Sequence, residues 1–208
     1  MQREGIDFNK DETYQPIAKH STLRTSLSLA ARNNWEIHQI DVKSAYLHGK
    51  LKEKIYMRQP PGFIVVGKEL MVCQLDKWLY GLRQSGGEWY KKHSSGMKAL
   101  NFKKCTVDHA CWWKIEDSKK IIVAKSVDNM ALFVSSISIL NKFKADYNRI
   151  FPITDLGEIH WLLGIGVTCN RKKVLCRYHR NPILIRLLKD SILKMQKNMT
   201  HLYHLVKS

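Results

Sequence analysis

The sequence predicts an α+β domain built on a mostly antiparallel sheet. Its periodic segments follow the order helix, strand, helix, strands, helix, strand, without the regular alternation that indicates a parallel sheet. Two apolar, β-rich runs at 121–124 and 130–134 flank a short polar centre at 125–129, which predicts a hairpin. The 208 residues suffice for one good core or two small ones.

The first half of the chain is expected to begin with a polar, irregular segment and then a helix. Ser21 and Thr22 are candidate N-caps, and leucines and alanines recur at helical spacing up to Asn33. A strand follows at 35–42, with alternating faces and Asp41 at its tip. The next expected elements are a short helical turn at 44–47, strands at 55–57 and 71–75 around a turn at 60–62, and a helix at 84–100, in which Gly86 and Gly87 each cost about 1 kcal/mol.

The second half is expected to add two hairpins, a helix and a basic tail. Residues 111–115 pair with 121–124 across Asp117 and Ser118, before the hairpin that carries Asp128. The remaining expected elements are a helix at 138–150, a strand at 161–167, a strand at 174–176 that pairs with it across a basic turn at 170–173, and an apolar stripe at 181–195.

The charge balance points to a polyanionic partner. Lys and Arg number 35 against 18 Asp and Glu, a net charge of +17, which favours nucleic acid first and an anionic membrane second. A dispersed, solvated basic surface is the alternative. Residues 171–208 hold ten of the cations and one acid, and the stretch 181–197 either packs as a thumb-like helix or serves as an amphipathic helix for a membrane or protein partner.

Several classes of site and location are disfavoured. The five cysteines are odd in number and lack a C-x-x-C pair, which argues against a disulfide framework, and the scattered histidines give no zinc-site spacing. The sequence has no apolar run near 18 residues and no signal-peptide pattern. We therefore expect a soluble intracellular protein, cytoplasmic or nuclear.

Two isolated carboxylates carry the chemical hypothesis. By itself Asp128 is typical of a turn residue that bonds its own backbone. If the strand ending at Asp41 lies beside the Asp128 hairpin, however, the two carboxylates meet at one sheet edge, and their repulsion is relieved by a divalent metal. A carboxylate-held metal pair in a basic cleft is the arrangement that runs phosphoryl transfer in polymerases.

Five stretches stand in the order and spacing of the motifs of one family. Together they resemble the copia-type retrotransposon reverse transcriptases, which are RNA-directed DNA polymerases, over about residues 5–168. The resemblance implies a palm-like, mostly antiparallel sheet packed by helices, acting in nucleotidyl transfer to a primer end. The stretches are QIDVKSAYLHG (39–49), YMRQPPGF (56–63), LYGLRQS (79–85) continued by WY (89–90), SVDN (126–129), and DLGE (155–158) followed by LGI (163–165).

The resemblance assigns roles to particular residues. Asp41 and Asp128 would be the catalytic carboxylates and would bind Mg²⁺ or Mn²⁺, with the Val42 carbonyl beside the metals. Tyr46 would lie under the incoming sugar and screen against a 2′-hydroxyl, although it is equally an ordinary core residue. The expected partners are an RNA or DNA template–primer and deoxynucleoside triphosphates, with no membrane partner; the pocket for template and nucleotide would be completed by Tyr80 and Gly81.

The sequence also departs from the family pattern. Asn129 replaces the second aspartate of the motif, which removes one negative charge and should weaken metal binding, and Ser126 replaces its tyrosine. Gly86 and Gly87 stand where the family usually has Pro-Arg, which frees the loop and removes a cation. We expect an irregular segment at 1–18, a palm-like domain at 19–168 with the fingers largely missing, and a basic segment at 169–208 with a thumb remnant.

Three functions remain open at this stage. The first is an RNA-directed DNA polymerase, catalytically impaired by Asn129 and by the missing fingers. The second is a palm relic that binds nucleic acid, mostly through phosphates, without catalysis. The third is a transposon-derived product without function, whose missing fingers leave sheet edges bare.

Overall fold

The computed structural model describes residues 2, 10–51, 53–163, 165–170 and 175–180. Two compact units, Met1–Glu158 and Ile159–Ser208, divide the chain, and each is described by itself. No helix among the described residues is long and apolar enough to span a membrane.

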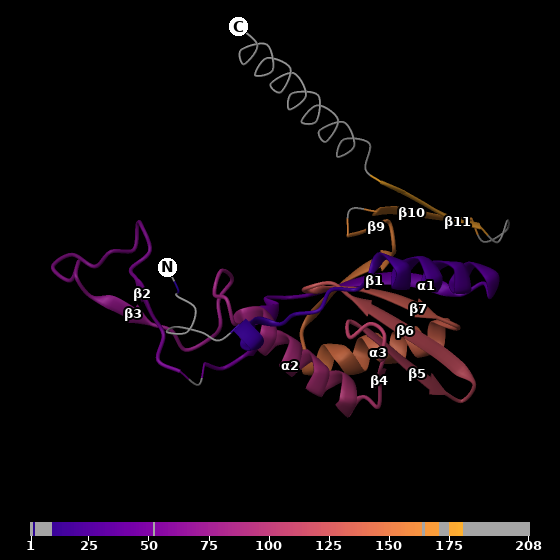
Figure 1. The fold of residues 1–208 in the computed structure, drawn as a ribbon, viewed down its shortest axis with the longest axis horizontal. Helices are drawn as coiled ribbons and strands as arrows, with labels where there is room; N and C mark the ends of the chain where they lie inside the picture. The colour runs from indigo at the N-terminus through magenta and orange to yellow at the C-terminus, as the bar shows by residue number, and fades with distance from the viewer. Residues whose placement is uncertain (1, 3–9, 52, 164, 171–174, 181–208) are drawn as a thin grey trace, which may run out of the picture. The chain divides into compact units, whose positions relative to one another are not determined.

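A six-stranded sheet forms the centre of the first unit (Figure 1). Its strand order is β4-β5-β6-β7-β1-β8, and every neighbouring pair is antiparallel, which confirms the predicted α+β class. The strands are β1 (Glu36–Val42), β4 (Lys103–Lys104), β5 (Cys111–Glu116), β6 (Lys119–Lys125), β7 (Asn129–Val134) and β8 (Ile153–Glu158).

Three helices cover the two faces of this sheet (Figure 1). Residues of α2 (Ser85–Ala99) and α3 (Ile137–Ile150) share one buried cluster with alternate residues of β1, β5, β6 and β7. Helix α1 (His20–Arg32) contacts β6 and β7 and lies on the other face. Trp89 and Trp112 are almost completely buried in the main cluster, so both are packing residues.

Strand β1 has the predicted alternation of faces. Ile40 and Val42 point into the main cluster, whereas Ile37 is buried on the α1 face. A 3-10 turn, η2 (Ala45–His48), follows at the expected place. Because side chains alternate along a strand, Asp41 lies on the same face as Ile37, at the end of the strand.

Helix α1 begins earlier than the sequence predicts, and its cap comes from elsewhere. The helix starts at His20, so Ser21 and Thr22 lie within its first turn. The prediction that they are N-caps is therefore wrong. Instead, the carboxylate of the buried Asp108 accepts hydrogen bonds from the Lys19 N–H and from the Thr22 hydroxyl. A distant carboxylate thus anchors the helix start through one backbone N–H and one hydroxyl.

Both predicted hairpins form. Asp117 and Ser118 join β5 to β6 with φ angles of 47° and 64°, the left-handed pair that suits the twist of a two-residue hairpin. Between β6 and β7, however, Lys125 belongs to the strand and is only 1% exposed, so its expected place in a polar turn is wrong. A separate pair, β2 (Tyr56–Arg58) and β3 (Val72–Gln74), matches the two short strands predicted there.

The second unit contains a three-stranded sheet in the order β11-β10-β9. The single strand expected at 161–167 is wrong: Leu163, at φ 50°, separates β9 (Trp161–Leu162) from β10 (Ile165–Asn170). β10 pairs with β11 (Leu175–Arg180), as expected for this hairpin. Of the basic turn expected at 170–173, Asn170 is the last residue of β10, and residues 171–173 lie outside the described residues. The stretch 181–197 also lies outside them.

Three described elements were not predicted. The 3-10 turn η1 (Lys10–Thr13) lies in the segment expected to be irregular, and β4 and β8 lie at the two edges of the sheet. Edge strands carry fewer buried apolar residues, so β8 reads as ITDLGE, without the alternation that marks a half-buried strand.

Candidate active site

The structure brings Asp41 and Asp128 to the same end of two adjacent inner strands of the sheet. β1 and β7 are adjacent and antiparallel, with Asp41 directly opposite Asn129. The Val42 N–H donates a 3.0 Å hydrogen bond to the Asp128 carbonyl, which fixes the end of the hairpin against β1. The expected meeting of the two carboxylate-bearing segments is therefore confirmed.

The two carboxylates influence each other electrostatically. The pKa of Asp41 is raised above its usual value, first by burial and then by the negative charge of Asp128. Both effects disfavour the ionised form of Asp41. A positive charge placed between the two side chains would remove this repulsion, so the geometry favours a cation at this strand end.

The amide of Asn129 links β7 to β1 and also contacts the neighbouring Asp128. Its Oδ1 accepts a hydrogen bond from Gln39 Nε2 at 3.0 Å, and its Nδ2 donates to Asp128 Oδ1 at 3.3 Å. The amide donor thus satisfies one carboxylate oxygen that a second aspartate would repel. With Asn129, this strand end carries one negative charge fewer than it would with an aspartate at the same position.

The donor set fits one divalent ion better than two. Oxygen ligands suit Mg²⁺ and Mn²⁺, and here the charged donors are the Asp41 and Asp128 carboxylates. No group of three or more His, Cys, Asp or Glu side chains that could hold a metal occurs among the described residues. Val42 directly follows Asp41 and Asn129 directly follows Asp128, so the Val42 carbonyl and the Asn129 amide oxygen are candidate neutral donors.

Helix α2 fixes the loop that carries Asp128. The indole of Trp89 donates a 2.7 Å hydrogen bond to the Val127 carbonyl, and the Ser126 N–H donates to the Asn129 carbonyl at 2.7 Å. Trp89 is 1% exposed, so its indole is rigidly held. The loop conformation is consequently coupled to the packing of α2 on the sheet.

Tyr46 and Tyr80 form an aromatic wall beside the carboxylates. Their ring centroids are 4.4 Å apart with an interplanar angle of 45°. Burial raises the pKa of Tyr80, and the negative charges of Asp128 and Asp41 raise it further. A hydrogen bond with the Ala45 backbone acts in the opposite direction. Both aspartates therefore lie near this wall. Gly81 follows at φ +100°, a conformation that glycine adopts without strain.

A buried lysine behind the site was missed by sequence reasoning. Lys125 Nζ lies 5.3 Å from the Trp89 ring centroid and 5.7 Å from that of Tyr90, and it has no hydrogen-bond partner within the described part of the chain. Burial lowers the pKa of Lys125 to about 7, although the charge of Asp128 acts in the opposite direction. The only sequence signal was a cation inside a β-rich segment.

His93 lies fully buried on the same side of the sheet. Its Nδ1 is 2.8 Å from the Tyr147 hydroxyl, and its ring packs edge-on against Trp112. Burial lowers the pKa of His93 well below its usual value, and the charge of Lys125 lowers it further. His93 is therefore neutral and serves as a packing residue of the core.

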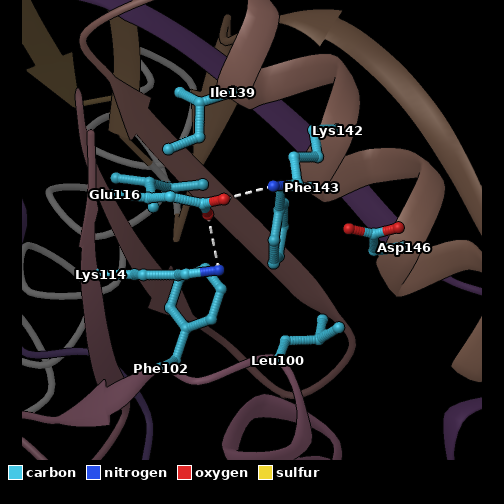
Figure 2. Close-up of a pocket in the computed structure, with 9 residues that line it drawn as sticks. Leu100, Phe102, Lys114, Glu116, Ile139, Lys142, Phe143 and Asp146 are labelled. Carbon is cyan, nitrogen blue, oxygen red and sulfur yellow. Dashed lines mark hydrogen bonds and ion pairs between the residues drawn. The ribbon is translucent and has the colours of Figure 1, made fainter. Parts of the chain in front are cut away.

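The pocket drawn in close-up lies away from these residues (Figure 2). It is found at the end of β6 opposite to Lys125, over an apolar floor, and encloses about 290 Å³ including its open mouth. Glu116 is paired there with Lys114 and Lys142, whose hydrogen bonds lower the pKa of Glu116 to about 2. Because these charges pair with one another, they leave no unpaired charge of this group to bind a ligand, and we assign the pocket no role in the site.

Comparison with known proteins adds the family context. A family model described as "Reverse transcriptase (RNA-dependent DNA polymerase)" matches residues 1–191. The "Retrovirus-related Pol polyprotein from transposon TNT 1-94" of Nicotiana tabacum is 42% identical over 171 residues, which cover 82% of this chain and 13% of that protein.

Two further relatives come from other organisms. The "Retrovirus-related Pol polyprotein from transposon RE1" of Arabidopsis thaliana is 31% identical over 79% of this chain, and the "Transposon Ty1-MR1 Gag-Pol polyprotein" of Saccharomyces cerevisiae is 34% identical over 81%. The matched region is 11% and 10% of these proteins, so the chain spans roughly a tenth of their length. The resemblance to copia-type elements is thereby confirmed.

Proposed function

The chain belongs to the reverse transcriptase family, as a domain of the kind found in retrotransposon Pol polyproteins, and we propose that it is a palm that binds template–primer but polymerises poorly. We assign this palm to residues 19–168. The observation that carries the proposal is the antiparallel pairing of β1 with β7, which puts Asp41 opposite Asn129 and beside Asp128.

The two aspartates are the proposed catalytic and metal-binding carboxylates. When bound, a divalent ion such as Mg²⁺ or Mn²⁺ supplies charge neutralisation for nucleotidyl transfer. Asp41 and Asp128 would hold it, with the Val42 carbonyl as a neutral ligand. The Trp89–Val127 hydrogen bond would keep the Asp128 loop at a fixed distance from β1.

Tyr46, Tyr80 and Gly81 are the proposed lining of the nucleotide and template pocket. The tilted ring pair offers a flat apolar wall next to the carboxylates. The left-handed backbone at Gly81 lets the chain turn closely beside Tyr80, which is 56% exposed and thus accessible to a ligand. A deoxynucleoside triphosphate would place its sugar against this wall.

Exposed cations near the site support binding to a phosphate backbone. Lys43 follows Asp41 by two residues, Lys50 and Lys77 meet in an isolated β-bridge, and Arg83 follows the Tyr80 segment. All four are exposed. With a chain net charge of +17, phosphate contacts should dominate affinity and make it fall steeply with salt.

Asn129 supports the reduced activity. A third carboxylate would add a negative charge to the ligand set. Asn129 supplies only a neutral oxygen, and its Nδ2 donates a hydrogen bond to Asp128. Phosphoryl transfer depends on neutralising charge that spreads over the phosphate oxygens. The second candidate function, favoured by this hydrogen bond, is nucleic-acid binding without catalysis.

Primer extension tests the proposal. The protein is incubated with an RNA template, a DNA primer, deoxynucleotides and Mg²⁺ or Mn²⁺, alongside Asp41→Ala, Asp128→Ala and Asn129→Asp variants. We expect weak extension that is lost in both alanine variants and increases in Asn129→Asp. Extension that survives in Asp41→Ala would place the chemistry elsewhere.

A binding assay separates the two candidate functions. Template–primer affinity is measured by fluorescence anisotropy at several salt concentrations, for the protein and for Asp41→Ala. Binding that falls steeply with salt and is unaffected by Asp41→Ala, without extension in any variant, would favour the non-catalytic function. Affinity independent of salt would contradict the phosphate-binding proposal.

A further inference from the structure

The hydroxyl of Tyr46 is held by a residue from the start of the chain. Tyr46 Oη donates a 3.1 Å hydrogen bond to Gln15 Oε1. Burial raises the pKa of Tyr46, the hydrogen bond to Gln15 opposes this, and the negative charge of Asp128 raises the pKa further. The tyrosine therefore keeps its proton, and that proton is directed at Gln15 and away from the carboxylates.

A glycine makes the space for this contact. A β-carbon at Gly86 would lie 2.3 Å from Gln15 Oε1 and 3.2 Å from both Gln15 Cβ and Cδ. These distances are too short for any other residue at 86 without movement of Gln15. The side chain of Gln15 consequently lies directly on the first turn of α2, between that helix and Tyr46.

The adjacent glycine fixes the backbone of the same segment. A β-carbon at Gly87 would come within 1.9 Å of the Glu12 carbonyl oxygen, so η1 rests on the helix backbone itself. The Gly86–Gly87 pair is thus a socket for residues 12–15. Glycine is a weak helix former, and the close approach gives its presence at these two positions a structural reason.

The amide of Gln15 also carries a buried donor. Gln15 Nε2 is buried and has no hydrogen-bond partner among the described residues. A buried amide donor without an acceptor is unfavourable. The hydrogen bond from Tyr46 to Gln15 Oε1 is thus what orients the Gln15 amide.

We propose that Gln15 is a positioning residue that sets how the Tyr46 wall treats the sugar of an incoming nucleotide. This rests on the proposed function, and it assigns to residues 12–15 and to Gly86 a part in the pocket. The hydrogen bond to Gln15 restrains rotation of the Tyr46 ring, so the ring stays in the space that a ribose 2′-hydroxyl would need. Loss of the contact frees the ring and weakens discrimination between deoxyribose and ribose.

The test measures a ratio of affinities. Dissociation constants for dATP and for ATP are determined with Mn²⁺ and template–primer present, by displacement of a fluorescent deoxynucleotide. Gln15→Leu, which keeps the side-chain size and removes the hydrogen bond, is expected to lower the preference for dATP about three- to tenfold, the factor that one hydrogen bond of ordinary net strength represents. Gly86→Ala, which pushes Gln15 away, is expected to act in the same direction.

Two further variants make the result specific. Gln15→Glu keeps an acceptor for Tyr46, and its added charge should weaken the binding of dATP and ATP equally. The ratio of their dissociation constants should therefore stay near that of the unmodified protein. Ser95→Ala, on the exposed side of α2, should leave both constants unchanged.

The outcomes distinguish this proposal from the proposed function. A preference that falls in Gln15→Leu and Gly86→Ala, but persists in Gln15→Glu, supports the positioning role. Nucleotide binding with an unchanged ratio in all variants overturns the role of Gln15 and leaves the palm function standing. Absence of nucleotide binding to the unmodified protein overturns the proposed function and this inference with it.

Discussion

The ammonium nitrogen of Lys125 lies 5.3 Å from the ring centroid of Trp89, the residue whose indole also holds the Val127 carbonyl. A cation is therefore buried directly beneath the Asp128 loop. Attraction to an aromatic face contributes up to about 2 kcal/mol for a desolvated cation, but removing an ammonium from water costs several kcal/mol. Burial lowers the pKa of Lys125 to about 7 against the opposing charge of Asp128, so desolvation outweighs the attraction to that carboxylate.

Lys125 should make stability depend on pH in a definite direction. In the unfolded chain Lys125 keeps a pKa of 10.5, so between about pH 7 and 10.5 the unfolded state binds more protons than the folded state. The free energy of unfolding should rise with pH across this window, and the full penalty of the buried charge should be present below pH 7. Lys125→Met should therefore be more stable at pH 6 by a few kcal/mol, with a difference that shrinks towards pH 9.

Urea unfolding of both proteins between pH 6 and 9 checks this expectation. Lys98→Met on the exposed side of α2 serves as the control, because it removes a solvated lysine. A Lys125→Met difference that stays constant over the whole range would show that Lys125 does not titrate in the folded protein.

Asp108 should contribute to stability through the start of α1. Its carboxylate accepts hydrogen bonds from the Lys19 N–H, the Thr22 hydroxyl and the Ala110 N–H. Burial alone would raise the pKa of Asp108, but these bonds hold it below its usual value. Asp108→Ala should lower the free energy of unfolding by about 1–3 kcal/mol, because it leaves two backbone donors without their acceptor.

The Asp108 effect should also have an acid dependence. Because the folded pKa is depressed, the stabilisation is present above the unfolded pKa and is lost as pH falls through the folded pKa. In urea unfolding, the difference in the free energy of unfolding between the unmodified protein and Asp108→Ala should therefore become smaller at acidic pH. Asp146→Ala, which removes an exposed pair with Arg149, should change stability by less than about 0.5 kcal/mol at any pH.

The elements that could be predicted from the sequence are those whose signal is local. The alternation in β1 follows from a period of two, and this period alone places Asp41 at a strand end. The turn at Asp117 and Ser118 is predictable because both residues tolerate left-handed backbone. Leu163 adopts the same left-handed region, and nothing in a leucine side chain predicts that conformation, so the break between β9 and β10 was missed.

The missed parts of the site depend on contacts between distant segments. Asp108 reaches α1 across more than 80 residues, and a Ser-Thr pair beside the helix start gave a stronger but misleading local signal. Gly86 and Gly87 appeared as weak points of a helix because the segment that requires them lies some 70 residues earlier. Lys125 contradicts the pattern rule itself, since a lysine in a hairpin centre is normally solvated.

Gly87→Ala should release η1 from α2. The new β-carbon would overlap the Glu12 backbone carbonyl, which cannot rotate away as a flexible side chain can. Alanine gains about 1 kcal/mol of helix propensity, but the overlap should exceed this, so the protein should become less stable. Cleavage after Glu12 by a glutamate-specific protease, followed by mass spectrometry, should become several times faster.

Ser95→Ala provides the matched control for Gly87→Ala. It places alanine at an exposed position of the same helix, where only the gain in helix propensity applies. Equal stabilisation by both substitutions, with unchanged cleavage after Glu12, would mean that η1 does not rest on the helix at Gly87.

Asn129→Asp should exchange stability of the metal-free protein for metal affinity. Without a divalent ion, the variant loses the Nδ2 hydrogen bond to Asp128 and places a third carboxylate beside Asp41, so unfolding should become easier by about 1–3 kcal/mol. With Mn²⁺ present, the added charge should tighten binding, and calorimetric titration should detect an affinity at least tenfold higher. With increasing Mn²⁺, the unfolding temperature should rise more in the variant than in the unmodified protein, since ligand binding to the folded state stabilises it by mass action.

Asn141→Asp adds the same charge on the exposed face of α3 and should leave Mn²⁺ affinity unchanged. If Asn129→Asp and Asn141→Asp had the same Mn²⁺ affinity, the strand end that carries Asp41 and Asp128 would not be the metal site.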